Sequence, residues 1–269
     1  MLETATYGPI TRLHLARTLL GRPLYAVNAY LVDGLLIDTG CPATAPELVA
    51  WCRGQEVRRA INTHHHEDHA GGDHALDKAL GLPIAAPPEA LPILANYYRL
   101  QVYRRAVWGQ PRDVVVEPLG ELVETGRYRF EVIPTPGHCP DHVCLFEREQ
   151  GWLFGGDLFI HEQVRYLRAD EDVWGILSSL RRALALRPNL LICAHAGFVE
   201  DACGAIARKI AYWEGLAAQA RALRAEGASL REVSDGLLGT ESLMTRITRE
   251  HFSKINLIRA LLEEAHHEE

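Results

Sequence analysis

The chain has 269 residues, with 28 lysines and arginines against 35 acidic residues and a formal net charge of −7 at pH 7. Hydrophobic residues make up 48% of it and charged residues 23%, which excludes a mainly disordered chain. The acidic balance argues against a general nucleic-acid-binding protein, because such proteins need a basic field that displaces counterions. The longest uncharged run, residues 188–199, is shorter than the roughly 20 apolar residues that cross a bilayer, so we expect no membrane span.

The cysteines and the N-terminal sequence together predict a cytoplasmic protein. The six cysteines form no C-x-x-C pair, and a chain of this length does not depend on disulfides, so we expect free core thiols in a reducing cytosol. The first residues lack the basic, apolar and small-residue sections of a signal peptide. Positive charge comes almost entirely from arginine, which together with a high alanine content suggests a bacterial source.

Short apolar runs alternate with turn signals through most of the chain, which is typical of strands mixed with helices. These runs predict strands at residues 27–32, 35–37, 57–62, 82–86, 114–116, 122–123, 128–133, 143–146, 152–154 and 190–193. Helical patterns predict helices at about residues 45–53, 70–80 and 173–186, and a helical insert at about residues 87–110.

The sequence changes character after Gly197, where strand signals become few. Three helices are predicted there, at about residues 199–225, 230–238 and 245–263. Ser229 and Glu232 form a capping-box pattern at the start of the second helix. We therefore expect a first domain over residues 1–200 and a helical C-terminal extension over residues 201–269.

Six consecutive residues, from His64 to His69, can each offer an imidazole or a carboxylate to a metal ion. The segment follows a predicted strand and precedes a predicted helix. Because side chains alternate along an extended chain, His64 and His66 point the same way and can hold one ion. Asp68 and His69 fall where the chain turns into the helix, so they can face a second ion nearby.

Further candidate ligands follow predicted strands: His138, Asp157 and His195 each come shortly after an apolar run and beside small or turn-forming residues. Ligands at strand ends are held rigidly enough to build a metal site. The pair Gly71-Gly72 lets the backbone pack closely behind the histidine-rich segment. The residues alone thus predict a metal site that gathers ligands from distant parts of the chain.

With these residues in place, the sequence resembles the metallo-β-lactamase superfamily, and it is most similar to the glyoxalase II-type dinuclear hydrolases. The family pattern is H-x-H-x-D-H, followed by a His, an Asp and a His. All of its positions are matched here, by His64, His66, Asp68, His69, His138, Asp157 and His195. The resemblance covers roughly residues 8–200 and implies an α/β fold, a four-layer αββα sandwich that carries the catalytic site, followed by the helical extension.

The resemblance also implies roles for single residues. His64, His66 and His138 would hold one metal ion, while a second ion would bind the ligands Asp68, His69 and His195. Asp157 would bridge the two ions. Asp38 would support the site without binding an ion, and His142 matches a position that is often His in the family, for which we expect a supporting or packing role.

Five imidazoles and two carboxylates suit two divalent ions, with zinc as the first choice and iron or manganese as alternatives. Two ions roughly 3.5–4 Å apart would share a water whose pKa falls from about 15.7 towards 7, which supplies a bridging hydroxide as nucleophile. Asp68 is the predicted catalytic residue, because it would hold this hydroxide in line and pass its proton to the leaving group. The sequence thus predicts a metal-dependent hydrolase of a small ester, thioester or lactone.

The insert carries three arginines and four aromatic residues over residues 96–108, without an acid. It is either a flap that captures an anionic or aromatic small molecule, or an amphipathic helix with buried aromatics and solvated arginines. The flap interpretation, with the loop after Asp157, gives these substrate-binding candidates: Tyr98, Arg105, Trp108, His161 and Arg165. Arg165 and Arg168 can add positive potential to the same mouth, although we favour a surface role for both.

Other functions stay open at this stage. The basic insert is compatible with an endoribonuclease-type phosphodiesterase, but the net charge of −7 makes nucleic acid the less favoured partner. A persulfide dioxygenase of the same superfamily would hold a single iron with His64, His138 and Asp157. A non-catalytic metal-dependent binding protein is a third alternative. The helical extension could close the pocket, form a homodimer contact, or resemble the helical addition of the superfamily's endoribonucleases.

Overall fold

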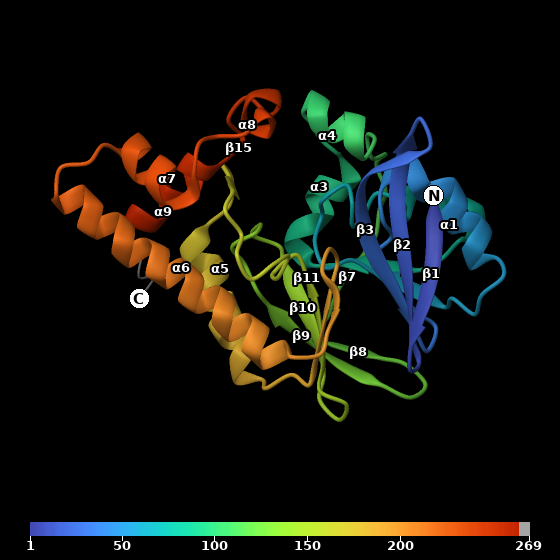
Figure 1. The fold of residues 1–269 in the computed structure, drawn as a ribbon. Helices are drawn as coiled ribbons and strands as arrows, with labels where there is room; N and C mark the ends of the chain where they lie inside the picture. Colours follow the sequence, from blue (N-terminus) through green and yellow to red (C-terminus); the bar gives the residue numbers. More distant parts are fainter. Residues whose placement is uncertain (264–269) are drawn as a thin grey trace.

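Two β-sheets face each other in the computed structural model, which describes residues 1–263, and helices cover both outer faces (Figure 1). The first sheet runs in sequence order and consists of β1 (Leu2–Tyr7), β2 (Ile10–Leu19), β3 (Arg22–Val32), β4 (Leu35–Ile37), β5 (Arg59–Ile61), β6 (Ile84–Ala86) and β7 (Glu117–Pro118). The second sheet has the order β14 (Gly197–Val199), β13 (Leu190–Cys193), β11 (Trp152–Gly156), β10 (Val143–Glu147), β9 (Arg129–Pro134) and β8 (Leu122–Glu124).

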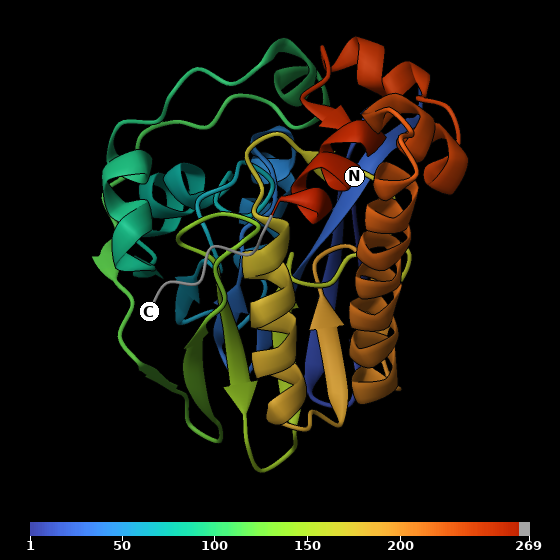
Figure 2. The same ribbon diagram turned by 90° about the vertical axis from the view of Figure 1, so that its left-hand side faces the viewer.

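The helices fall into two outer layers and two smaller groups. The first sheet is covered by α1 (Ala45–Cys52) and α2 (Asp73–Leu80), and the second by α5 (Val173–Ala185) and α6 (Ala202–Ala225) (Figures 1 and 2). The insert forms α3 (Leu91–Ala95) and α4 (Val102–Val107), and the C-terminal part adds α7 (Leu230–Leu238), α8 (Leu243–Ile247) and α9 (Lys254–Leu262). The predicted four-layer αββα sandwich with a helical C-terminal region is therefore confirmed.

Apolar side chains pack in three layers that follow this architecture. The layer between the sheets joins residues such as Ile37 and Ile61 of the first sheet to Phe130 and Phe154 of the second. Separate clusters lie under α1 and α2 and under α5 and α6. Because α6 shares its cluster with the second sheet, the boundary near residue 200 stays a prediction rather than a visible division.

The carboxyl ends of several strands lie at one edge of the sandwich. In the first sheet β4 and β5 run parallel, and in the second β11 and β13 run parallel, so each pair ends on the same side. The segments that carry the candidate ligands follow β5, β9, β11 and β13. Residues far apart in sequence are thereby brought to one place.

Several sequence predictions about elements need correction. The run at residues 114–116 is not a strand, because Val115 is 87% exposed and no described strand pairs with it. The first two strands were missed; five of the six residues of β1 are exposed, so it has no apolar run to signal it. The helix predicted at residues 199–225 begins later, after the short strand β14.

The largest difference concerns the helix predicted at residues 245–263. It is broken into α8 and α9, with the strand β15 (Phe252–Ser253) between them. Arg249 and Glu250 adopt positive φ angles of 53° and 64°, which ends the helical path. Strand β15 pairs with β12 (Leu167–Arg168), a contact between the C-terminal region and the loop after Asp157.

Other predictions hold. The strand β13 and the helix α7 have the predicted bounds, and the capping box of Ser229 and Glu232 is formed. All six cysteines are free, and five of them are buried. Among the described residues, no helix is long and apolar enough to cross a membrane.

Candidate metal centre

The histidine-rich segment turns sharply after β5 and is held from behind by main-chain contacts. The amide of Thr39 donates to the carbonyl of His69 (2.6 Å). A Cβ at Gly71 would lie 2.2 Å from the carbonyl oxygen of Glu67, so only glycine fits there. Asp38 itself has a positive φ of 61°, a strained conformation for a residue with a side chain. The predicted close packing behind the segment is therefore observed.

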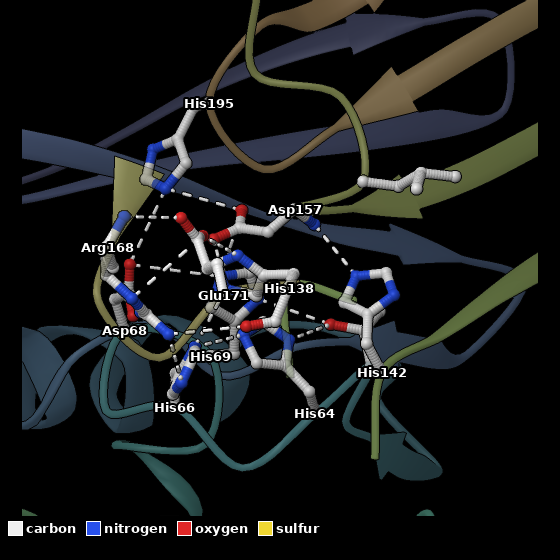
Figure 3. A network of polar contacts seen from close by, with 12 residues as sticks. His64, His66, Asp68, His69, His138, His142, Asp157, Arg168, Glu171 and His195 are labelled. Carbon is white, nitrogen blue, oxygen red and sulfur yellow. Dashed lines mark hydrogen bonds and ion pairs between the residues drawn. The ribbon is translucent and has the colours of Figure 1, made fainter. Parts of the chain in front are cut away.

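The first candidate ligand set consists of three histidines, His64, His66 and His138 (Figure 3). Nδ1 of His66 lies 2.8 Å from Nε2 of His64 and 2.9 Å from Nε2 of His138. Asp157 joins this set, because its Oδ2 lies 3.3 Å from Nε2 of His138. One nitrogen of each ring is thus aimed at a common centre.

The second set consists of Asp68, His69 and His195, and it meets the other oxygen of Asp157. Oδ1 of Asp157 lies 3.4 Å from Nε2 of His69 and 3.4 Å from Nε2 of His195. Oδ2 of Asp68 lies 3.6 Å from Nε2 of His195. The four ligand atoms all lie within 4.8 Å of one another, which suits a shared ion. Asp157 therefore faces both sets, one with each carboxylate oxygen.

Two buried polar atoms in the centre have no hydrogen-bond partner among the described residues. They are Nε2 of His69 and Oδ1 of Asp157. A buried polar atom without a partner costs roughly 1–3 kcal/mol. A divalent ion between them would satisfy both atoms, and the nitrogen and carboxylate donors around them suit zinc or iron. The residues present therefore fit the two metal ions that the resemblance implies.

The electrostatics of the centre depend on burial and on its neighbours. Burial lowers the pKa of His64 and of His66 well below the usual value, so both rings are neutral and have a lone pair for an ion. Burial opposes the ionisation of Asp157, but His195, His69 and the other imidazoles outweigh it and hold the pKa of Asp157 well below its usual range. Asp157, which faces both ligand sets, is therefore a carboxylate.

The second nitrogen of each ligand ring has its own partner. Oδ2 of Asp38 lies 2.8 Å from Nδ1 of His69, and the carbonyl of Ala26 lies 2.9 Å from Nδ1 of His195. Such partners fix which ring nitrogen carries the proton and orient the other towards the ion. Asp38 therefore lies behind a candidate ligand ring, and its supporting role stays a prediction.

His142 also lies behind the ligands rather than among them. Its Nε2 accepts a hydrogen bond from the amide of Asp157 (3.1 Å), and its Nδ1 lies 2.8 Å from the hydroxyl of Thr135. A Cβ on the neighbouring Gly156 would come within 2.7 Å of this Nε2. His142 therefore contacts the Asp157 turn from behind, and its supporting role stays a prediction.

The sequence analysis missed Glu171, whose Oε1 lies 2.7 Å from Nδ1 of His138. It belongs to the acidic run at residues 170–172, just before α5. Asp172 caps that helix by accepting from the amide of Trp174. A helix cap needs only one of these three acids. The two additional acids were the signal in the sequence that could have indicated a second role, such as contact with a ligand.

Arg168 was expected at the surface, but its side chain is only 12% exposed. Its Nη2 lies 3.2 Å from Nε2 of His66 and 3.4 Å from the carbonyl of His138 (Figure 3). The surface expectation for Arg168 is therefore wrong, because the pairing of β12 with β15 turns this residue towards the ligands.

One predicted substrate-binding residue, Trp108, lies beside a ligand ring. Its ring lies 6.5 Å from that of His195, and the half-exposed Tyr25 lies 5.1 Å from the same imidazole. Tyr98 lies 6.3 Å from the ring of His65, which belongs to neither ligand set. Trp108 and Tyr25 therefore flank the centre beside His195, and the substrate-binding role of Tyr98 stays a prediction.

The remaining candidates are His161, Arg165 and Arg105. His161 and Arg165 are exposed on the loop after β11. Among the described residues, no hydrogen bond or ion pair joins either side chain, or that of Arg105, to a ligand of the centre. Their substrate-binding roles stay predictions.

The insert is anchored to the ligand segment through residues that the sequence analysis did not single out. Arg104 of α4 donates from Nε to Oε1 of Glu67 (2.6 Å) and also binds its other oxygen, and both side chains are buried. The hydroxyl of Tyr97 donates to the carbonyl of His65 (2.7 Å). The predicted picture of solvated arginines on the insert is therefore wrong for Arg104.

His65 points away from the two ligand sets. Its amide and its Nδ1 each lie 2.8 Å from an oxygen of Asp141, and Cys139 is close enough to complete a third group of metal-binding type. Because both oxygens of Asp141 already receive hydrogen bonds from His65, this group fixes the ligand segment from its outer side.

The fold and the paired ligand sets define a metal-binding protein of the αββα sandwich class. A sequence profile of the metallo-beta-lactamase superfamily matches residues 22–195, and the chain belongs to this superfamily.

Relatives of known sequence include an uncharacterized protein of Aquifex aeolicus, 28% identical over 63% of this chain and 84% of that protein. A beta-lactamase-like protein 2 homolog of Drosophila melanogaster is 28% identical over 68% of this chain and 63% of its own length. A hydroxyacylglutathione hydrolase of a Polaromonas species is 27% identical over 62% of each chain. The chain thus spans less than two thirds of the last two proteins.

Solved structures share the fold. A metallo-beta-lactamase family protein of Thermus thermophilus has a TM-score of 0.66 and 22% identity, covering 96% of this chain and 93% of that chain. A beta-lactamase domain protein of Burkholderia ambifaria has a TM-score of 0.71 and 18% identity, covering 97% of this chain and 88% of that one. A protein solved in a di-iron-bound form has a TM-score of 0.56 and 29% identity, covering 72% of this chain and 98% of that chain.

Proposed function

We propose that the protein is a dinuclear metal-dependent hydrolase of a small ester, thioester or lactone. The observation that carries this proposal is the pair of ligand sets that share Asp157, with two buried atoms left for an ion to satisfy. Hydroxyacylglutathione hydrolases among the relatives support a thioester within this range, although the chain spans only part of their length.

One ion would bind His64, His66 and His138, and the other would bind the ligands Asp68, His69 and His195, with Asp157 between them. Zinc suits these nitrogen and oxygen donors, and so does iron. The 29% identical structure in a di-iron-bound form supports iron as the first alternative to zinc. When bound, two such ions lower the pKa of a water and offset the negative charge that develops on an attacked carbonyl oxygen.

Asp68 is the residue we propose for proton transfer. Burial raises its pKa, but His69 and His195 outweigh this effect and keep the carboxyl ionised at neutral pH. An ionised carboxylate can accept a proton on Oδ1 or Oδ2 and pass it to the leaving group. Trp108 and Tyr25 beside His195 would exclude bulk water from one side of the reacting centre.

The alternative functions gain no specific support. A phosphodiesterase with a basic RNA surface would need the arginines of the insert, but Arg104 is already paired with Glu67. A single-iron persulfide dioxygenase would leave the second ligand set without a role. A bacterial source, a cytoplasmic location and a homodimer stay predictions.

The test is metal analysis of the purified protein, followed by a hydrolysis panel of thioesters, esters, lactones and phosphodiesters with and without EDTA. We expect about two transition-metal ions per chain and a turnover of thioesters or esters that EDTA abolishes. A protein without transition metal, or one whose hydrolytic activity is unchanged by EDTA, would sink the proposal.

A further inference from the structure

The guanidinium of Arg168 stands directly beside a metal-ligand candidate and is only partly used. Its Nε donates to Oδ1 of Asp170 (3.0 Å), and its Nη2 is 3.2 Å from Nε2 of His66. No acceptor for Nη1 is found among the described residues. Figure 3 shows the guanidinium on the same side of the cluster as His66 and Asp68. The permanently charged guanidinium of Arg168, with one free N–H donor group, is thus separated from the candidate ligand atoms only by the ring of His66.

The contact between Arg168 and His66 changes character when an ion is bound. Nδ1 of His66 is the nitrogen that faces His64 and His138, so it is the one that would hold an ion. A neutral imidazole that binds an ion through Nδ1 carries its proton on Nε2. Nη2 of Arg168 then keeps two acceptors, the carbonyl of His138 (3.4 Å) and Oδ2 of Asp170 (3.5 Å). The donors left for a ligand are Nη1 of Arg168 and Nε2 of His66, and an oxyanion can accept from both.

The neighbouring charges favour an anion of single charge. Asp170 accepts from Nε of Arg168, and Glu171 accepts from the main-chain amide of Arg168 (2.8 Å). The two carboxylates are repelled more strongly by a dianionic phosphate than by a carboxylate. The planar fork of a guanidinium also matches the two oxygens of a carboxylate.

The C-terminal region holds Arg168 in this position. The strand β15 pairs with β12, the amide of Ala169 donates to the carbonyl of His251 (2.8 Å), and Asn256 donates to the carbonyl of Leu167 (3.3 Å). His251 also reaches the insert, since its Nδ1 lies 2.8 Å from the hydroxyl of Tyr103. The extension therefore contributes to the metal centre by placing Arg168 there.

We propose that Arg168 and His66 form an anion-binding subsite beside the metal centre, and that the substrate carries a carboxylate near the acyl group that is hydrolysed. This inference rests on the proposed function, because it names the substrate class of the same site.

The test measures dissociation constants by calorimetry on the zinc-loaded protein, with succinate and butyrate as probes. Both have four carbons and one carboxylate that can bind zinc, but only succinate has a second carboxylate for Arg168. We expect succinate to bind roughly 10- to 100-fold tighter than butyrate. In Arg168→Ala this ratio falls to within about threefold, and in Arg168→Lys it lies between, because a lysine keeps the charge without the fork.

The matched control is Arg148→Ala. Arg148 also makes a two-pronged pair with a carboxylate, at 2.7 and 2.8 Å from Glu131, but it follows the end of β10 that is remote from His142. In Arg148→Ala, the preference for succinate over butyrate should equal that of the unchanged protein. Zinc content is measured on every sample, and if Arg168→Ala loses zinc, the ratio is taken from Arg168→Lys and Arg168→Gln. An unchanged ratio in the zinc-loaded variants would overturn the subsite.

A third probe, 3-phosphonopropionate, separates the two kinds of oxyanion. If Arg168→Ala weakens this probe more than it weakens succinate, the carboxylate assignment is wrong and a phosphate-type group takes its place. Turnover is measured separately, on thiophenyl succinate and thiophenyl butyrate. If succinate binds more tightly than butyrate as expected but no substrate is turned over, the proposed hydrolase is contradicted and the subsite stands. If the substrates are turned over but the Arg168 variants leave the preference for succinate unchanged, the subsite is contradicted and the hydrolase stands.

Discussion

The two ligand sets of the candidate metal centre are supported in different ways. The set of Asp68, His69 and His195 is backed by the interior of the sandwich, where Asp38 binds both His69 and the amide of Thr63. In the other set, His66 and His138 instead contact residues 168–171, which pair with the C-terminal region, while Nδ1 of His64 lies 3.0 Å from the hydroxyl of Thr63. One set is therefore fixed by the sheets, and the other depends in part on a contact between distant parts of the chain.

The largest effect should come from the one residue common to both sets. Asp157→Asn removes a negative charge and one good ligand oxygen, so we expect the bound metal to fall from two ions per chain to one or none, with a loss of activity of order 10³-fold. Plasma mass spectrometry measures the number of bound ions, and the hydrolysis assay measures the loss of activity. Retention of two ions at unchanged affinity would show that Asp157 does not join the sets.

The second prediction concerns Glu67, which lies between a ligand of each set. Arg104→Ala should lower the free energy of unfolding by roughly 3–5 kcal/mol, because it leaves a buried carboxylate without its partner. Burial and the neighbouring Asp68 already raise the pKa of Glu67, and Arg104 opposes them. Urea unfolding measures the change, and adding Glu67→Gln should restore part of it.

The control for this pair is Arg181→Ala, which breaks the exposed ion pair with Glu214 and should cost less than about 1 kcal/mol. Equal losses for Arg104→Ala and Arg181→Ala would contradict an energetic anchor between the insert and the ligand segment.

The third prediction tests the interior support of the second set through Asp73. Burial raises the pKa of Asp73 to about 7, while its hydroxyl and amide partners Thr39 and Asn62 oppose the shift. The folded state therefore binds the proton of Asp73 more tightly than the unfolded state does. The resulting contribution to the free energy of unfolding is fully present below about pH 4 and is lost as the pH rises through 7. The loss amounts to up to roughly 4 kcal/mol.

Asp73→Asn should flatten this dependence, since an amide does not ionise and can pair with Asn62, whose Oδ1 has no partner among the described residues. The measurement is the free energy of unfolding at saturating zinc from pH 5 to 8, so that both proteins carry the same metal linkage. Parallel pH profiles for the two proteins would count against a raised pKa at Asp73.

The smallest predicted effect separates the two sets directly. Glu171→Gln should weaken the ion held by His64, His66 and His138 by roughly 10- to 100-fold, and Asp38→Asn should weaken the other ion to a similar degree. Stepwise zinc titration against a chelator measures the two affinities, with the surface variant Glu162→Gln as control. If both variants weaken the same ion, the assignment of the two supports is wrong.

The contrast between the sets also shows how far the sequence could be interpreted. The segment from His64 to His69 was predictable because its ligands are neighbours whose directions follow from local geometry. Asp157 and His195 were predictable as polar residues at the ends of apolar strands. Glu171 was not, because its partner His138 lies 33 residues away and only the folded loop brings them together.

The C-terminal region was the least predictable part. No glycine or proline interrupts residues 245–263, so the pattern indicated one helix. The break at Arg249 and Glu250 uses strained φ angles, which the pairing of β15 with β12 maintains. That pairing also turned Arg168 inward, so both errors have the same tertiary cause.

The central claim is that the chain gathers two ions around Asp157. Anomalous diffraction from crystals of the zinc-loaded protein tests it most directly. We predict two peaks, one among His64, His66 and His138 and the other among Asp68, His69 and His195. A single peak, or a peak at the outer group of His65, Cys139 and Asp141, would contradict the account.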